Sequence, residues 1–417
     1  MGFDRRLDLI NFLLADVRGG LGPYVGVFLI ATGQWDEARI GLVLTVSGLI
    51  GISLHAPIGA LIDATRHKRA LLIGGVMALA GSAVAIARAP VMPVVLAADI
   101  VMAVLGAVFA PIVAAITVGL VARERLAARL GRNAACDRAG NIAAAAVAGI
   151  AGWLLSVEAV FYLVPAFALL TSLAVLSIPA AAIDHERARG LEAATPARQP
   201  HAESWRTMLR HPPLLALAGG MALFHFANAP ILLLLGMRLE ELRPGSVTLL
   251  MSLAIVVAQL VSIPIALFVG THADRWGRKP LLLLGLAALP LRLLLYAVTD
   301  HPAWLVPGQI LDGVSLGTLD ALLALVLADI MRGTGRYNAA RGLVGTVQGI
   351  GGSSSNLVAG LLVVGAGYGP AFLALAVSGL AAVLLVLLAL PETGPANRRA
   401  DGAARPSGEP DRTALLG

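Results

Sequence analysis

The sequence predicts an all-α integral membrane protein whose twelve transmembrane helices form two pseudo-symmetric six-helix bundles. Three observations support this class: the composition, twelve apolar runs, and one charged motif that occurs twice. The 417 residues are 58% hydrophobic and only 13% charged, with a mean hydropathy of +0.83. Soluble chains carry about 25% charged residues. This chain has too little charge to cover a soluble surface, so its surplus apolar side chains must face lipid.

The twelve apolar runs each approach the length of about 20 residues that a helix needs to cross a bilayer. Six of them precede a polar segment and six follow it. In chain order the predicted spans are 8–32, 40–63, 70–88, 92–121, 133–154, 159–180, 212–237, 245–271, 279–298, 302–331, 338–365 and 369–390.

The polar, proline-bearing and charged segment 183–211 is predicted to be a cytoplasmic linker. It separates an N-terminal bundle, residues 1–182, from a C-terminal bundle, residues 212–391. Residues 392–417 are rich in Arg, Gly, Pro and Ala, a composition typical of a disordered tail.

The distribution of Lys and Arg predicts the orientation. With the N-terminus inside, the inside segments hold 23 basic residues and the outside segments hold four, as the positive-inside rule requires. We therefore expect a multi-pass protein of the bacterial inner membrane with both termini in the cytoplasm. The net charge of +6 is confined to loops between apolar runs, which argues against a nucleic-acid partner.

A short charged motif follows the second span of each half, 211 residues apart. In each copy an Asp stands four residues after a Gly and is followed by basic residues. The first copy comprises Gly59, Asp63, Arg66, Lys68 and Arg69, and the second comprises Gly270, Asp274, Arg275, Gly277, Arg278 and Lys279. A repeated hydrophobic unit with a repeated charged loop is typical of duplicated transporter bundles.

Two parallel six-helix halves, a long cytoplasmic linker and this loop motif together resemble the major facilitator superfamily over residues 1–391. The second copy matches the superfamily motif at every defining position. The first copy departs from it, because Arg66 replaces the second Gly and the basic residues are displaced. The resemblance implies that the loops form a gate, a latch that holds the cytoplasmic side closed while the cavity faces outward.

The physical reading of the gate motif starts from the helix dipole. Asp63 and Asp274 end helices whose C-termini are already negative, so each needs a positive partner such as an Arg or the N-terminus of a neighbouring helix. A partner present in only one conformation would make a latch. The alternative is that the basic residues only set the topology.

Two helices contain Gly and Pro near their middle at matching positions, which is a sequence signature of a transporter binding site. The first is broken around Pro23 and the seventh around Pro230. Proline frees a backbone carbonyl that must face protein or a cavity. We therefore expect the central cavity between these two helices, close to His225 and Asn228. His225 is either a proton carrier or a packing residue.

Ionisable groups within spans cost about 2.5–3.5 kcal/mol each, so those that are present are functional candidates. Asp16 and Arg18 lie near the middle of the first helix, and Asn141 lies on the polar stripe of the fifth. We predict that Asp16 pairs with Arg138, either in a static network or with Asp16 binding a proton or a cationic substrate.

In the second half, Arg292 and Asp312 lie at similar depth in a helical hairpin, which predicts a structural ion pair. Asp320 is rotated by about 80° from Asp312 and is expected to face the cavity. Gln348 lies on a polar stripe of the eleventh span with Asn356 nearby, a pattern that favours cavity lining. Asp99 and Asp329 lie nearer helix ends, and we attribute them to solvation.

These features favour a secondary active transporter that moves a small solute by alternating access, with proton coupling as the favoured mechanism. Uniport or another coupling ion remains open, as do the direction of transport, the substrate and its charge. The alternative is a non-transporting membrane receptor or scaffold of the same fold. An enzyme is not expected, because no catalytic, metal or cofactor motif occurs. The expected partners are a small-molecule substrate, protons and the lipid bilayer, and the expected state is a monomer.

Overall fold

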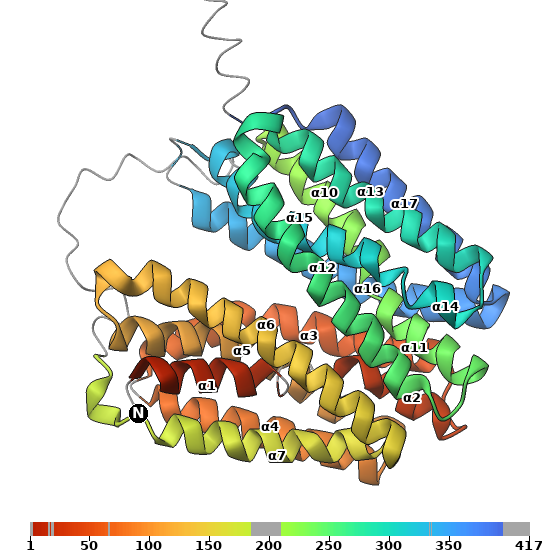
Figure 1. Ribbon diagram of the computed structural model, residues 1–417, viewed down its shortest axis with the longest axis horizontal. Helices are drawn as coiled ribbons and strands as arrows, with labels where there is room; N and C mark the ends of the chain where they lie inside the picture. Colours follow the sequence, from red (N-terminus) through yellow and green to blue (C-terminus); the bar gives the residue numbers. More distant parts are fainter. Residues whose placement is uncertain are drawn as a thin grey trace, which may run out of the picture.

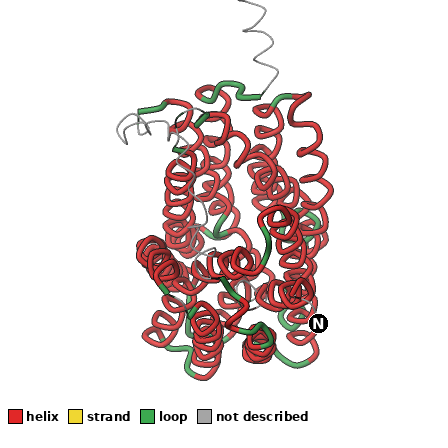
Figure 2. Tube along the Cα trace, turned by 90° about the vertical axis from the view of Figure 1, so that its left-hand side faces the viewer, coloured by secondary structure: helices red, strands yellow, loops and turns green. Residues whose placement is uncertain are grey.

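The computed structural model describes residues 3–15, 17, 21–65, 67–184, 210–332, 334 and 336–394. Within these ranges the chain forms helices and loops without a strand (Figure 2). The first half contains α1 (Phe3–Ala15), α2 (Gly22–Ala31), α3 (Glu37–Ala64), α4 (Lys68–Arg88), α5 (Met92–Leu120), α6 (Arg123–Leu154), α7 (Ala159–Leu176) and the short 3-10 helix η2 (Ala180–Ala182). The second half contains α10 (Pro212–Asn228), α11 (Ile231–Leu242), α12 (Val247–Trp276), α13 (Arg278–Val298), α14 (Pro302–Leu305), α15 (Gln309–Ile330), α16 (Tyr337–Ala366) and α17 (Tyr368–Ala389).

Each of the twelve predicted spans corresponds to one helix or to two consecutive helices. The first span is the pair α1 and α2, and the seventh is the pair α10 and α11, so both helices are interrupted at the predicted places. Pro23 lies in the first turn of α2, and Pro230 is the N-cap of α11. Proline is tolerated at these positions because the N–H that it lacks would have no partner in the helix.

Ten segments in the described part of the chain are long and apolar enough to cross a membrane. The first and fifth predicted spans are the two that this criterion omits. The first is divided between α1 and α2, each too short by itself. The fifth, predicted as 133–154, is the second part of α6, which begins ten residues earlier at Arg123. Its first part is rich in Arg, which lowers its mean hydropathy although the helix is 32 residues long.

The helices form two bundles, one from each half of the sequence (Figure 1). We call the end at which α1 begins and α17 ends the terminal face, and the end at which α2 and α11 end the distal face. The bundles meet through three main helix pairs, α3 with α16, α6 with α12 and α2 with α11. In Figure 1 they converge at the distal face, near α2 and α11, and diverge toward the terminal face, near the N-terminus.

Candidate functional site

The bundles approach each other most closely in the distal half, through small residues. A Cβ added at Gly41 would lie 2.3 Å from the backbone oxygen of Asn356, and one added at Gly360 would lie 2.2 Å from that of Glu37. These contacts join α3 to α16. A Cβ at Gly149 of α6 would lie 2.0 Å from the hydroxyl of Ser252 on α12. Small residues of this kind allow helix backbones to pack directly in membranes.

Hydrogen bonds between the bundles strengthen the same distal contact. The hydroxyl of Tyr24 lies 2.8 Å from that of Ser252, which donates to the carbonyl of Ala145 at 2.5 Å. Thr45 of α3 donates to the carbonyl of Ser353 at 2.7 Å. At the distal face itself, Tyr368 donates to a carboxylate oxygen of Glu37 at 2.7 Å. The distal half is therefore closed by both packing and polar contacts.

Halfway along the helices, an ion pair links the two bundles. Arg138 lies near the middle of α6 and forms a salt bridge with Asp320, near the middle of α15. Arg138 also donates to the side-chain oxygen of Gln259 at 3.3 Å and to the Ser262 hydroxyl at 3.2 Å, both on α12. The side chains of Arg138 and Asp320 are 30% and 42% exposed. A partly exposed charge pair at mid-depth is within reach of a solute.

A cavity of about 270 Å³ lies beside this ion pair, between α15 and α16. Its polar lining consists of Asp320, Arg341 and Gln348, and its remaining walls are mostly aliphatic. The structure thus places Asp320 and Gln348, two residues that the sequence predicts for the pathway, at one cavity. Arg341, from the same predicted stripe as Gln348, adds a positive charge. This combination suits a small polar solute with groups that accept hydrogen bonds from Arg and donate to a carboxylate.

Asn228, at the interruption between α10 and α11, belongs to a different cluster. Its side-chain oxygen accepts a hydrogen bond from Arg292, which is 2% exposed. Arg292 lies 2.5 Å from Asp312 and donates to Gln309 at 3.2 Å. The Arg292–Asp312 contact is the one that the depth argument predicts. The cluster joins α10, α13 and α15, so it holds the broken helix in place within its own bundle.

The central cavity was expected between the first and seventh helices, and the structure differs there. Their distal parts, α2 and α11, pack directly: a Cβ at Gly26 would meet Leu233 at 2.2 Å, and one at Gly236 would meet Val27 at 2.8 Å. A ring nitrogen of His225 lies 2.9 Å from the backbone oxygen of Met221 in its own helix. The reason is that the helix breaks are followed by small residues on facing surfaces, which close the seam.

Three further predicted residues have the following positions. Asn141 donates to the backbone of Asp137 at 2.9 Å, within α6. Asn356 donates to carbonyls of its own helix at 3.3 and 3.4 Å and lines a cavity of about 240 Å³ at the seam of the bundles. Asp16 and Arg18 lie outside the described residues, so the Asp16–Arg138 pair stays a prediction. The partner that the structure gives Arg138 is Asp320.

The second copy of the gate motif forms its contacts within its own bundle. Asp274, in the last turn of α12 that follows Gly270 and leads to Arg275, lies 3.1 Å from Arg278. Arg278 also pairs with Asp329 at the end of α15, and Lys279 donates its ammonium to the carbonyl of Leu387 at 2.7 Å. The attribution of Asp329 to solvation was wrong, because its side chain is 7% exposed and paired.

The turn of this copy and the end of α17 hold each other. Gly277, with φ of +88°, connects α12 to α13 in a conformation that favours glycine. The carboxylate of Glu392 then accepts hydrogen bonds from the backbone N–H groups of Arg278 at 2.9 Å and Lys279 at 3.1 Å. A carboxylate at a helix N-terminus satisfies otherwise free donors and complements the dipole.

The first copy is described less fully. Arg66 and the side chains of Gly59 and Asp63 lie outside the described residues. The Lys68 ammonium, 1% exposed, donates to the carbonyls of Ile62 at 2.8 Å and Thr65 at 2.9 Å. Arg69 donates to the carbonyl of Leu176 at 3.1 Å. This lysine therefore occupies the negative end of α3, as the dipole argument requires of a positive partner.

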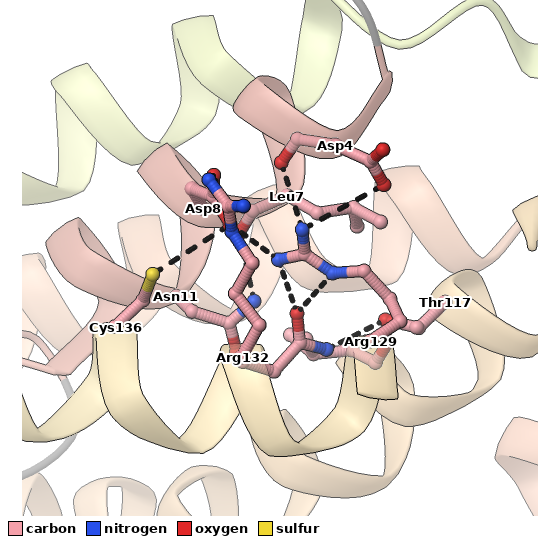
Figure 3. A network of polar contacts seen from close by, with 10 residues as sticks. Asp4, Leu7, Asp8, Asn11, Thr117, Arg129, Arg132 and Cys136 are labelled. Atoms are coloured by element: carbon pink, nitrogen blue, oxygen red, sulfur yellow. Dashed lines mark hydrogen bonds and ion pairs between the residues drawn. The ribbon is translucent and has the colours of Figure 1, made fainter. Parts of the chain in front are cut away.

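A charge network missed by the sequence reasoning lies at the terminal face of the first bundle (Figure 3). Asp8 of α1 accepts from Arg129 at 2.6 Å and from Arg132 at 2.6 Å, both on α6. Arg129 is 4% exposed and also donates to Asn133. The thiol of Cys136 lies 3.6 Å from Asp8. The alternation of acidic residues in α1 and basic residues at one turn's spacing in α6 was the available signal.

Asp99 of α5 was also misjudged. Its attribution to solvation was wrong, because the side chain is 7% exposed and its described partner is the hydroxyl of Ser47 on α3. The distal ends of α3, α4 and α5 pack together, so a position seven residues from a helix end is already inside the bundle.

Comparisons with known proteins give a consistent result. Residues 5–374 match the family described as "MFS_1 like family". The chain is 43% identical over 392 residues to an uncharacterized MFS-type transporter of Mycobacterium tuberculosis, and the match covers 93% of each chain. Among solved structures, the nucleoside transporter NupG has a TM-score of 0.77 at 16% identity, covering 94% of this chain and 100% of that chain. The D-xylose-proton symporter has a TM-score of 0.72 at 14% identity, covering 94% and 98%.

Proposed function

Because the chain belongs to the MFS_1-like family of the major facilitator superfamily, we propose that it is a secondary active transporter for a small polar solute. The solute passes between the two bundles by alternating access. The observation that carries this proposal is the Arg138–Asp320 ion pair, which joins the bundles at mid-depth beside the cavity lined by Arg341 and Gln348. A solute that competes for these charges couples its own binding to the contact between the bundles.

The orientation follows from the basic residues. The terminal face carries most of the Lys and Arg, so it faces the cytoplasm of a bacterial cell, and both termini lie on that side. The distal face is closed by backbone contacts, so the described conformation is one in which the site opens toward the cytoplasm. The membrane is the bacterial inner membrane, in which the positive-inside rule sets the topology of multi-pass proteins.

The substrate is expected to be a small hydrophilic molecule, of the size and polarity of a nucleoside or a pentose, the substrates named for two proteins of the same fold. We further propose coupling to protons. Of the carriers expected from the sequence, Asp320 is held by Arg138, and His225 bonds to its own helix. Protonation of Asp320 would release Arg138 for an acidic or hydroxylated solute.

The experiment is a thermal-shift screen of the purified protein against nucleosides, sugars, amino acids and drugs, followed by flux measurements in proteoliposomes. A ligand that binds the folded state raises the melting temperature. We expect at least one ligand whose uptake depends on Arg138 and Asp320 and responds to a pH gradient. Binding without flux would replace the transport proposal with a receptor, and flux independent of a pH gradient would remove the proton.

A further inference from the structure

The first bundle holds an acidic side chain that the proposed transport cycle has not used. Asp99 lies seven residues into α5 and is 7% exposed. It lines a cavity of about 240 Å³ whose other walls include Leu21, Leu79 and Met102. An ionised carboxylate in such apolar surroundings is costly unless a positive group or several donors compensate it.

The single hydrogen bond of Asp99 indicates which group carries the proton. The hydroxyl of Ser47 contacts Asp99 and also lies 2.8 Å from the carbonyl oxygen of Val43. A hydroxyl has one hydrogen, and a carbonyl can only accept. When Ser47 donates to Val43, as serine often does within a helix, the hydrogen shared with Asp99 must come from the carboxyl group. The geometry therefore suits a protonated Asp99 that donates to Ser47.

The surroundings contain no compensating charge among the residues that the structure describes. The cavity is lined from α2, α3, α4, α5 and α16, and Asp99 is the one charged residue in that lining. Its other polar members are Ser47 and Asn356, and Asn356 donates its amide to its own helix. Asp16 and Arg18 belong to the adjoining segment, outside the described residues, and the test below includes Asp16.

The cavity also reaches the seam between the bundles. Ser47 is followed by Gly48, where an added Cβ would lie 2.4 Å from the hydroxyl of Ser353 on α16. Asn356, on the same helix, forms part of the cavity wall. Separation of α3 from α16 would therefore open the surroundings of Asp99 to water at the distal face. The protonation of Asp99 and the closure of the distal face are linked by these contacts.

We propose that Asp99 is a proton-binding site that is loaded from the distal face and enclosed when the bundles close there. The inference rests on the proposed transport function and assigns its coupling ion to a residue. With the distal face open, the hydrated carboxylate takes a proton from water. With that face closed, the neutral acid is the form that burial tolerates. Protonation thus favours the distal-closed state, and alkaline pH favours the distal-open state.

The test is infrared spectroscopy of the full-length protein in lipid vesicles, measured as the difference between acid and alkaline pH. A protonated carboxyl group has a C=O stretching band that the carboxylate lacks. We expect this band to disappear as the pH rises in the unmodified protein, to be absent in Asp99→Asn, and to shift in Asp99→Glu. The variants Asp16→Asn and Asp312→Asn should keep it.

A second readout follows the conformation. Spin labels at Ala31→Cys and Arg243→Cys, in a Cys136→Ala background, report the distance across the distal face. The distance should lengthen with rising pH, and Asp99→Asn should hold it short at every pH. A band that survives in Asp99→Asn, or a distance in that variant that still follows pH, would overturn the proton site.

The failure of this inference can be separated from failure of the proposed function. The substitution Gly360→Leu obstructs the distal seam by sterics, without involving Asp99. If that variant opens the distal face and closes the terminal face while no Asp99 band exists, the proton site is rejected and alternating access stands. If that variant leaves both faces unchanged, the transport cycle itself is rejected.

Discussion

The distal and terminal faces of the molecule are built from different interactions. At the distal face the bundles are held by shape, with helix backbones in contact at Gly41 and Gly360 and a hydrogen bond between Tyr368 and Glu37. At the terminal face the strong interactions are charges, and they are satisfied within each bundle, as in the Asp8–Arg129 and Asp274–Arg278 pairs.

The difference has a physical consequence for switching. Small-residue packing is lost abruptly when backbones separate, because van der Waals attraction has a short range. Charge pairs on a hydrated face are worth little individually, so they can exchange partners at low cost. The distal face is thus the rigid seal of the described state, and the terminal face holds charges available for a new contact across the bundles. The Arg138–Asp320 pair lies between the two regimes.

The largest effect is expected from breaking the distal seal. The substitution Gly360→Leu places atoms where the backbone of Glu37 lies, and backbone cannot move aside without separating the helices. We expect a cysteine at Met237, which is buried in the α2–α11 region, to become reactive toward a water-soluble maleimide. The matched control is Gly365→Leu on the same helix, where an added Cβ meets nothing within 4 Å. Equal reactivity in both variants would contradict the account.

The sequence predicted relations within a bundle better than relations between bundles. The Arg292–Asp312 contact followed from counting residues on either side of one hairpin, because a short turn fixes the relative depth of its two helices. No such turn connects α6 to α15, so the Asp320 partner of Arg138 was not predictable. Likewise, Asp99 looked solvent-accessible by its distance from a helix end, a criterion that ignores which neighbouring helices cover that end.

The next effect concerns the mid-depth ion pair that separates the two faces. Replacing either partner, Arg138→Ala or Asp320→Ala, leaves a charge without its partner and should lower the melting temperature. The exchange Arg138→Asp with Asp320→Arg should recover part of the loss, with a coupling free energy of about 1–2 kcal/mol. A double-mutant cycle measured by thermal unfolding in detergent checks this. Additive losses would mean that the pair contributes nothing to the contact between the bundles.

A smaller effect is expected at the gate loop. Asp274 is 72% exposed and bonds only to Arg278 among the contacts described for it. The substitution Asp274→Ala should therefore leave the described state nearly as stable as before and weaken the opposite state, in which the terminal face is closed. The measurement is the fraction of closed terminal distances by spin-label spectroscopy, with Asp300→Ala as an exposed distal control. A higher closed fraction in Asp274→Ala would exclude a latch.

The smallest effect is expected where the end of α17 supports the terminal face. Glu392→Ala removes the acceptor for the N–H groups of Arg278 and Lys279 and should cost about 1 kcal/mol, as loss of a helix cap does. Thermal unfolding measures it. Glu158→Ala is the matched control, because Glu158 precedes α7 without capping it through its side chain. Equal losses would show that the cap contributes no stability.

Alternating access is the central claim, and paired distance measurements test it most directly. One spin-label pair, Arg125→Cys with Gly342→Cys, spans the terminal face, and the other, Ala31→Cys with Arg243→Cys, spans the distal face. In lipid vesicles, introducing Gly360→Leu should lengthen the distal distance and shorten the terminal distance in the same population of molecules. A longer distal distance with an unchanged terminal distance would contradict the claim, because the two bundles would then not move as coupled rigid bodies.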